Sequence, residues 1–290
     1  MPLDALQRAR LLRWIRPALV GGVLWAALTS VAMVSVPAVP GGAKVLPGKV
    51  SAAPEDSRWV QVREHEIDGL RVTEVVLGRT DVDAELPLLV QFHGRGSRPT
   101  IPTGDHTRTP PVRLMLPWAP DPLGDGYTWF PLSVTEGRDK VLGHHIERRV
   151  QQLAHVIKKF ASLRPTEGRP LVAGFSQGGM LTFGLALLRP DLVEAAFPLA
   201  GWLPSYLVDR YLDPSRTYPP IRALHGSGDP VVPLVETRAM VRRLQASGLD
   251  ATLEVFESDQ HELPAAAWTR YKAHVREAIR LRRRGAPDLG

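Results

Sequence analysis

The sequence predicts an α/β fold: a mostly parallel central sheet with an N-terminal antiparallel hairpin and helices on both faces. Two observations lead to this prediction. Short apolar runs alternate along the chain with segments whose apolar residues recur at helical spacing. Two β-like runs separated by Asp68-Gly69 precede that alternation. Alternating strands and helices build a parallel sheet covered on both sides, and a chain of 290 residues with 44% hydrophobic content can fill its core.

The predicted strands are short. Residues 59–67 and 70–77 form the hairpin, with Asp68-Gly69 as a two-residue turn. Residues 86–92 are an almost continuous apolar run, which is typical of a strand covered on both faces. The remaining strands are expected at 114–118, 171–175, 195–199, 221–224 and 252–256.

Four segments are predicted to be helical. Apolar residues recur at helical spacing from Leu142 to Phe160, and Pro165 closes that helix. A second helix at 179–188 directly follows the strand at 171–175, and the last two are expected at 235–245 and 265–281. Each helix would connect two neighbouring strands or cover the sheet after its last strand.

The chain divides into three predicted regions. Residues 1–36 are a basic segment followed by an apolar one, residues 37–57 are a linker rich in Pro, Gly and Ala, and residues 58–290 form the folded domain.

The run at 18–36 carries no charge and is close to the roughly 20 residues that span a bilayer as a helix. Arginines before it and none just after it predict an N-terminus in the cytoplasm and a domain outside, in the cell envelope. The small residues at 36–38 leave open a cleaved signal peptide, which would give a secreted or periplasmic protein.

Composition excludes several classes of function. The net charge of +6 comes mainly from arginines near the two ends, so no nucleic-acid partner is expected. The absence of cysteine excludes disulfides and thiolate nucleophiles. No His-Glu-x-x-His motif occurs, and no glycine fingerprint follows the first strand, so neither a metal nor another cofactor is expected.

The most informative motif is the pentapeptide Gly-Phe-Ser-Gln-Gly at 174–178, placed between a predicted strand and a predicted helix. This pattern is typical of a nucleophile elbow, a sharp turn that presents a serine hydroxyl at the edge of the sheet. Glycine occupies positions 174 and 178 because a bulkier side chain at either would collide with neighbouring backbone at so sharp a turn. Ser176 is therefore the candidate nucleophile.

A serine hydroxyl needs a base, and the base needs an orienting carboxylate. After an elbow the expected order along the chain is serine, acid, histidine. Asp229 follows one predicted strand, and His261 follows the last. Asp213 and Asp259 remain possible orienting groups, although the first lies in a proline-rich insertion and the second is close to His261 in sequence.

An attacked carbonyl also needs hydrogen-bond donors for its developing oxyanion. One candidate is the backbone N–H of Gln177, the residue after the nucleophile. The other is the N–H of Arg95 in the glycine-containing loop at 93–96, which follows the strand at 86–92.

These motifs carry a family resemblance. The segments Phe-His-Gly-Arg-Gly at 92–96, Gly-Phe-Ser-Gln-Gly-Gly at 174–179 and His-Gly-Ser-Gly-Asp-Pro-Val-Val-Pro at 225–233, with the late His261, resemble the phospholipase/carboxylesterase family of the α/β-hydrolase superfamily. That family includes acyl-protein thioesterases and small bacterial carboxylesterases. The resemblance covers roughly residues 86–281.

The resemblance implies an α/β-hydrolase fold, a serine triad, no cofactor, and small-molecule or acylated ester or thioester substrates. Trp129-Phe130 also resembles part of a loop near the site in this family, and with Trp202 it is a candidate substrate-binding element. The chain departs from the family in its predicted membrane segment and in Arg95, where an apolar residue is common.

The resulting hypothesis is a serine hydrolase that cleaves carboxylic esters or thioesters through Ser176, Asp229 and His261 and an acyl-enzyme intermediate. Three alternatives stay open. A peptidase or an acyltransferase would use the same triad, and a membrane-tethered binding protein would keep the fold without catalysis.

Overall fold

The computed structural model describes residues 49–51, 57–131 and 139–285. All described residues belong to one compact unit, Ala43–Gly290. The predicted membrane or signal segment at 1–36 and most of the linker at 37–57 lie outside the described residues, so both stay predictions. In the described ranges, no helix combines the length and apolar character needed to cross a membrane.

A nine-stranded sheet forms the centre of the described part of the chain. Its strands lie in the order β1-β2-β3-β5-β4-β8-β9-β10-β11. The strands are β1 (Lys49–Ser51), β2 (Val60–Ile67), β3 (Leu70–Leu77), β4 (Leu86–Phe92), β5 (Val112–Pro117), β8 (Thr166–Phe175), β9 (Ala195–Leu199), β10 (Ile221–Gly226) and β11 (Ala251–Phe256).

The type of strand pairing changes once across the sheet, from antiparallel to parallel. β1 to β3 and β5 pair antiparallel, and every pair from β5 to β11 is parallel. The predicted hairpin is present, with Asp68 and Gly69 both at positive φ in its turn. The predicted fold class, a mostly parallel sheet preceded by an antiparallel hairpin, is confirmed.

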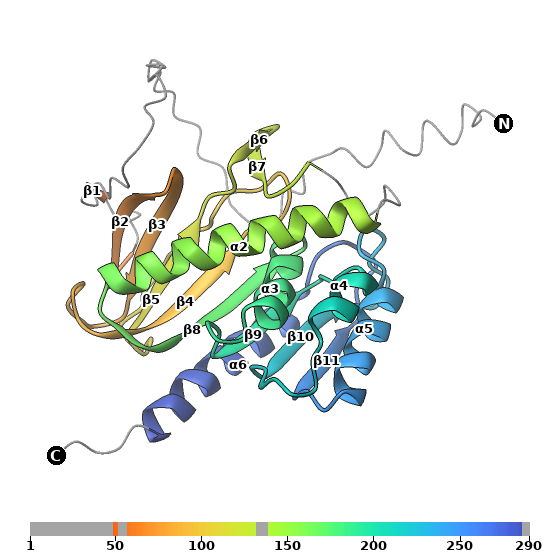
Figure 1. Ribbon diagram of the computed structural model, residues 1–290. Coiled ribbons are helices and arrows are strands. Elements are labelled where there is room, and N and C mark those ends of the chain that lie inside the picture. The colour runs from red at the N-terminus through yellow and green to blue at the C-terminus, as the bar shows by residue number, and fades with distance from the viewer. Residues whose placement is uncertain (1–48, 52–56, 132–138, 286–290) are drawn as a thin grey trace. The chain divides into compact units, whose positions relative to one another are not determined.

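Helices cover both faces of the sheet (Figure 1). α2 (Asp139–Leu163), α3 (Gln177–Leu188), α4 (Ser205–Tyr211) and α5 (Leu234–Ala246) contribute side chains to one buried cluster. α6 (Ala265–Gly285) contributes to a second cluster on the opposite face. Alternation along β4 explains the division, because Leu88 and Val90 belong to the first cluster and Leu89 to the second.

Helix α3 has the most central position. All of its residues are buried, which agrees with a sequence that is apolar on every side. It packs between the sheet and α2, where the added Cβ of an alanine at Gly184 would lie 2.7 Å from a methyl carbon of Val150. This burial fixes the start of α3, and with it the residue that precedes the helix.

Four elements were not predicted. They are β1, α4, and the two strands β6 (Asp121–Leu123) and β7 (Gly126–Thr128), which form a separate two-stranded sheet. The strands have three residues each and are too short to show a period. β8 also begins before the predicted residue 171, because Thr166 and Glu167 pair with Leu86 and Pro87 at the start of β4.

A buried ionic cluster lies near the amino ends of β5 and β8. Glu74 Oε1 accepts hydrogen bonds from the Nε atoms of Arg113 and Arg164, each at 2.8 Å. The side chains of Glu74 and Arg113 are both fully buried. Burial alone raises the pKa of Glu74, but hydrogen bonding to His65 and the two guanidinium charges outweigh it and hold the pKa below its usual value. The carboxylate therefore stays charged inside the protein.

Glu74→Gln is expected to lower the free energy of unfolding by about 3–5 kcal/mol, because Arg113 would keep its charge without a buried anion. Urea denaturation at neutral pH measures the change. Glu194→Gln removes one partner of the exposed Arg169 pair and is the matched control, with an expected loss below about 1 kcal/mol. Equal losses in the two variants would contradict this account of the cluster.

Candidate active site

Ser176 stands at the turn between β8 and α3 with φ 58° and ψ −118°. A positive φ is strained for any residue other than glycine, and such strain persists only where the surroundings hold it. Here the Ser176 N–H donates to the carbonyl of Leu199 at 2.9 Å, and the Ser176 carbonyl accepts from the N–H of Met180 at 3.0 Å. The predicted strand, turn and helix are therefore in place around this serine.

The glycines on both sides of the turn allow a close approach of backbone. An added Cβ at Gly178 would lie 2.2 Å from the carbonyl oxygen of Phe92, and one at Gly174 would lie 2.4 Å from the carbonyl oxygen of Gly178. Distances this short are incompatible with a side chain, so the elbow requires glycine at both positions.

The structure brings the three predicted catalytic side chains into one hydrogen-bonded line. His261 Nε2 lies 2.8 Å from Ser176 Oγ, and His261 Nδ1 lies 2.7 Å from Asp229 Oδ2. The three residues follow β8, β10 and β11, so all of them lie beyond the carboxyl ends of parallel strands. With Asp229 ionised, Nδ1 of a neutral imidazole donates to the carboxylate, and Nε2 is left to accept the serine proton.

Asp229 is held in the charged form that this arrangement needs. Its Oδ1 accepts hydrogen bonds from the N–H groups of Val231 and Val232, both at 2.9 Å. Burial by itself raises the pKa of Asp229, but its contact with His261 and these two N–H groups outweigh burial, so the pKa is lower than usual. Of the alternatives, Asp213 is exposed and accepts hydrogen bonds from Ser215, and Asp259 is exposed on the surface.

Two other histidines lie close to these turns and bind backbone. His93 Nδ1 is 2.8 Å from the Gly94 carbonyl, and its Nε2 accepts from the N–H of Ala119 at 3.1 Å. His225 is fully buried, and its Nε2 donates to the carbonyl of Val232 at 2.9 Å. Burial lowers the pKa of both rings, which favours their neutral forms.

The two predicted oxyanion donors belong to turns beside the serine. Gln177 is the first residue of α3. Gly94 adjoins the nucleophile, since an added Cβ there would lie 3.6 Å from Ser176 Cβ. The following turn is closed by a hydrogen bond from Ser97 N–H to the Gly94 carbonyl at 3.2 Å, and the Arg95 side chain is exposed. Both N–H groups are thus placed on segments that touch Ser176.

The three predicted substrate-binding residues are buried. Trp129 is 0% exposed, Phe130 2% and Trp202 7%. The indole N–H of Trp129 donates to the His93 carbonyl at 2.8 Å, which favours a packing role for this side chain. The indole N–H of Trp202 has no hydrogen-bond partner among the described residues. A role in substrate binding stays a prediction for all three.

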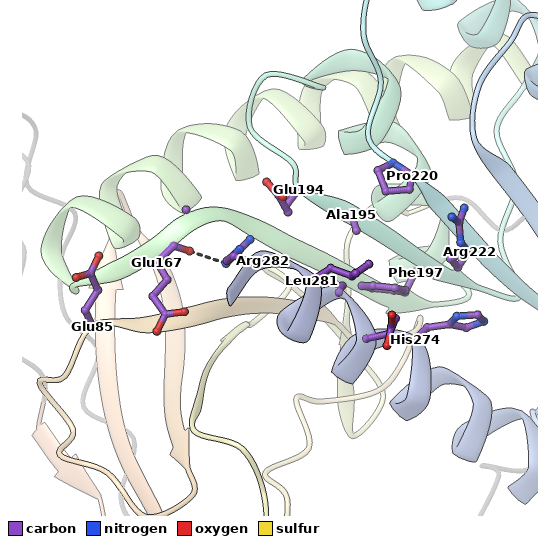
Figure 2. Close-up of a pocket in the computed structure, with 13 residues that line it drawn as sticks. Glu85, Glu167, Glu194, Ala195, Phe197, Pro220, Arg222, His274, Leu281 and Arg282 are labelled. Atoms are coloured by element: carbon purple, nitrogen blue, oxygen red, sulfur yellow. Dashed lines mark hydrogen bonds between the residues drawn. The ribbon is translucent and has the colours of Figure 1, made fainter. Parts of the chain in front are cut away.

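A separate recess of about 960 Å³ lies at the opposite end of the strands (Figure 2). Glu167 and Ala195 line it at the amino ends of β8 and β9, and Arg282 of α6 donates to the Glu167 carbonyl at 2.5 Å. None of the predicted site residues lines this recess. Within the described part of the chain, no group of three or more His, Asp or Glu side chains has the geometry of a metal site.

Gly178→Ala is expected to destabilise the fold by about 1–3 kcal/mol and to abolish the serine-dependent activity, because its Cβ would overlap the Phe92 carbonyl. Thermal unfolding and ester turnover measure the two effects. Gly69→Ala is the control: its Cβ meets no atom within 4 Å, so only the left-handed turn conformation is penalised, and activity is retained. A fully active Gly178→Ala variant would show that the turn is not as tight as described.

Solved structures of known proteins share this fold. Three similar solved structures are an esterase named PE8 (23% identity, TM-score 0.60, covering 70% of this chain and 97% of that one), a Bacillus cereus carboxylesterase (14%, 0.54, 71% and 94%) and Zea mays acyl-protein thioesterase 2 (18%, 0.51, 71% and 98%). At these identities the likeness shows the α/β-hydrolase fold. A search of the curated proteins finds no match.

The sequence profile of a family described as Phospholipase/Carboxylesterase matches residues 81–279, which is more than half of the chain and includes Ser176, Asp229 and His261. The resemblance inferred from the short motifs is confirmed, over nearly the same region as predicted. The chain therefore belongs to the phospholipase/carboxylesterase family and is a hydrolase of the carboxylesterase and thioesterase type.

Proposed function

We propose that this protein hydrolyses carboxylic esters or thioesters through an acyl-enzyme formed on Ser176. The single observation that carries the proposal is the continuous line of hydrogen bonds from Asp229 through His261 to the Ser176 hydroxyl. A serine hydroxyl becomes an effective nucleophile when an oriented base accepts its proton. Membership of the phospholipase/carboxylesterase family supports the ester or thioester class of substrate.

In the first half of the reaction, Ser176 Oγ attacks the substrate carbonyl and His261 Nε2 takes the serine proton. The imidazolium that results is stabilised by Asp229, whose carboxylate contacts Nδ1. His261 then gives the proton to the departing alcohol or thiol, and the acyl group stays on Ser176. Water, deprotonated by the same imidazole, attacks the acyl-enzyme, and the imidazolium returns the proton to Ser176 Oγ as the acid departs.

The negative charge on the tetrahedral intermediate needs donors that are already in position. We assign this role to the backbone N–H groups of Gln177 and Arg95. The contact of Gly94 with Ser176 and the place of Gln177 at the start of α3 support the assignment. The positive end of the helix dipole adds to the field at the same point.

Trp202, like Trp129 and Phe130, stays a candidate for substrate contact. It lies shortly after the end of β9, whose last residue, Leu199, accepts the hydrogen bond from Ser176 N–H. Its indole N–H is buried and has no partner in the described ranges, so a substrate would contact the exposed edge of the Trp202 ring rather than this N–H. The cell-envelope location and the membrane tether remain proposals that rest on residues 1–36 of the sequence alone.

The direct test combines a fluorophosphonate probe with hydrolysis of short p-nitrophenyl esters and thioesters. The wild type is expected to be labelled and active, and Ser176→Ala is expected to lose labelling and at least about 10³-fold in kcat. Ser205→Ala, an exposed serine at the start of α4, is the control and should match the wild type. Undiminished labelling and turnover in Ser176→Ala would exclude the proposed nucleophile.

The same assays separate the alternatives. Added alcohols that accept the acyl group faster than water would indicate an acyltransferase, and cleavage of peptides in preference to esters would indicate a peptidase. A wild-type protein that is inert to the probe and to every ester and thioester would indicate a binding protein with a hydrolase fold.

A further inference from the structure

We propose that the segment 127–130, which is hydrogen-bonded to the side chain of Gln177, sets the spacing between the two N–H groups of the oxyanion hole. In this account Gln177 has two separate functions, since its backbone donates to the oxyanion and its carboxamide positions the other donor. Trp129 is a second positioning residue. The inference deepens the proposed function and rests on the assignment of the Gln177 and Arg95 amides.

The two donors of the oxyanion hole lie on segments that the fold does not hold equally firmly. Gln177 is fixed by the buried helix α3. Arg95 belongs to a loop that leaves β4, and residues 93–111 contain no helix to anchor it before β5 begins. Oxyanion donors must be positioned to within about 0.5 Å of the geometry that places each N–H roughly 2.7–3.1 Å from the oxyanion. Other contacts must therefore hold this loop against the elbow.

Residues 127–130 bind the loop through three hydrogen bonds. The Gly96 N–H donates to the Tyr127 carbonyl at 2.8 Å, and the Tyr127 N–H donates to the Ser97 carbonyl at 2.9 Å. The Trp129 indole N–H donates to the His93 carbonyl at 2.8 Å. These contacts reach the loop on both sides of Arg95.

The two backbones also touch directly next to this segment. An added Cβ at Gly126 would lie 2.2 Å from the carbonyl oxygen of Gly96, so only glycine permits the approach. The rings of His93 and Trp129 pack with their centroids 5.1 Å apart. The loop is therefore fixed relative to residues 127–130 by packing as well as by hydrogen bonds.

The same segment is bound from the other side by the carboxamide of Gln177. Its Oε1 accepts from the Trp129 N–H at 3.1 Å and lies 3.0 Å from the Thr128 hydroxyl, while its Nε2 donates to the Phe130 carbonyl at 3.0 Å. Gln177 is only 5% exposed, so these contacts are made away from water. Arg149 of α2 adds a hydrogen bond from its Nε to the Trp129 carbonyl at 2.9 Å.

This geometry explains why a polar side chain occupies the first position of a helix that is otherwise almost entirely apolar. The site needs an acceptor for Trp129 N–H and a donor for the Phe130 carbonyl on one planar group, which glutamine supplies. Methionine has a similar length but supplies neither. Gln177→Met therefore removes the side-chain hydrogen bonds to residues 128–130 while it keeps the backbone N–H of residue 177.

Loss of the hydrogen bonds that join Gln177 to residues 127–130 should raise the free energy of the transition state more than that of the bound substrate. The oxyanion donors act mainly on charge that develops during the attack, and a misplacement of about 1 Å is sufficient for a loss of about 10²-fold in rate. Gln177→Met is expected to lower kcat by about 10- to 100-fold and to change KM by less than about threefold. Trp129→Phe, which removes the indole N–H, should lower kcat in the same direction.

The experiment compares Gln177→Met, Trp129→Phe and the double variant on a p-nitrophenyl ester. Because both single changes release the same loop, the loss in the double variant should be smaller than the product of the two single losses. Gln91→Met is the matched control. Gln91 lies in β4, and its partly buried side chain donates a hydrogen bond to the hydroxyl of Tyr271 in α6, away from residues 127–130. The substitution should lower stability while it leaves kcat within about twofold of the wild type.

Hydrogen–deuterium exchange of the unliganded proteins gives a readout that does not need turnover. The amides of residues 94–97 should exchange faster in Gln177→Met than in the wild type and should be unchanged in Gln91→Met. An unchanged exchange rate in Gln177→Met, a wild-type kcat, or an equal loss of kcat in Gln91→Met would overturn the inference. If the wild type lacks serine-dependent turnover, the proposed function fails, and the exchange comparison still decides whether Gln177 positions the loop.

Discussion

The contact between the His261 imidazole and Ser176 is the interaction on which the rest of this site depends. It joins two residues that are 85 positions apart, and Asp229 extends the line to a third turn. No local structure produces such a contact. The parallel order of β8, β9, β10 and β11 produces it, because their carboxyl ends meet at one edge of the sheet and the chain turns there each time. The parallel sheet therefore places the His261 imidazole next to the Ser176 hydroxyl.

The strain at Ser176 is maintained by the burial of its neighbours. Its left-handed backbone conformation would relax in an isolated peptide, but β8 and α3 lie in the core on either side of it. The hydrogen bonds to Leu199 and Met180 close the turn from both directions. The buried charge of Glu74 is maintained in a similar way, since hydrogen bonding to His65 and the charges of Arg164 and Arg113 keep the carboxylate ionised. In both places a locally unfavourable state is held by the surrounding structure.

The sequence was sufficient to predict the parts of the site that follow from local patterns and from topology. The elbow has a short signature, and the order of Ser176, Asp229 and His261 follows from the order of the strands. The hydrogen bonds of the Gln177 carboxamide to Thr128, Trp129 and Phe130 were not predicted, because they join residues 47 to 49 positions apart and no periodic pattern in the sequence indicates them. The burial of Trp129 was missed for a related reason. An aromatic residue after a glycine-rich turn is expected in a surface loop. Only the tertiary structure shows that helix α2 and the elbow enclose Trp129.

A crystal structure of the protein after reaction with a fluorophosphonate is the decisive test of the Ser176 site, because the tetrahedral phosphonate imitates the acyl-transfer intermediate. The proposed mechanism predicts phosphorus bonded to Ser176 Oγ, with a phosphonyl oxygen roughly 2.7–3.1 Å from the N–H groups of both Gln177 and Arg95. It also predicts that the carboxamide of Gln177 keeps its contacts with residues 127–130. An adduct on another side chain, or a phosphonyl oxygen that reaches neither N–H group, would contradict it.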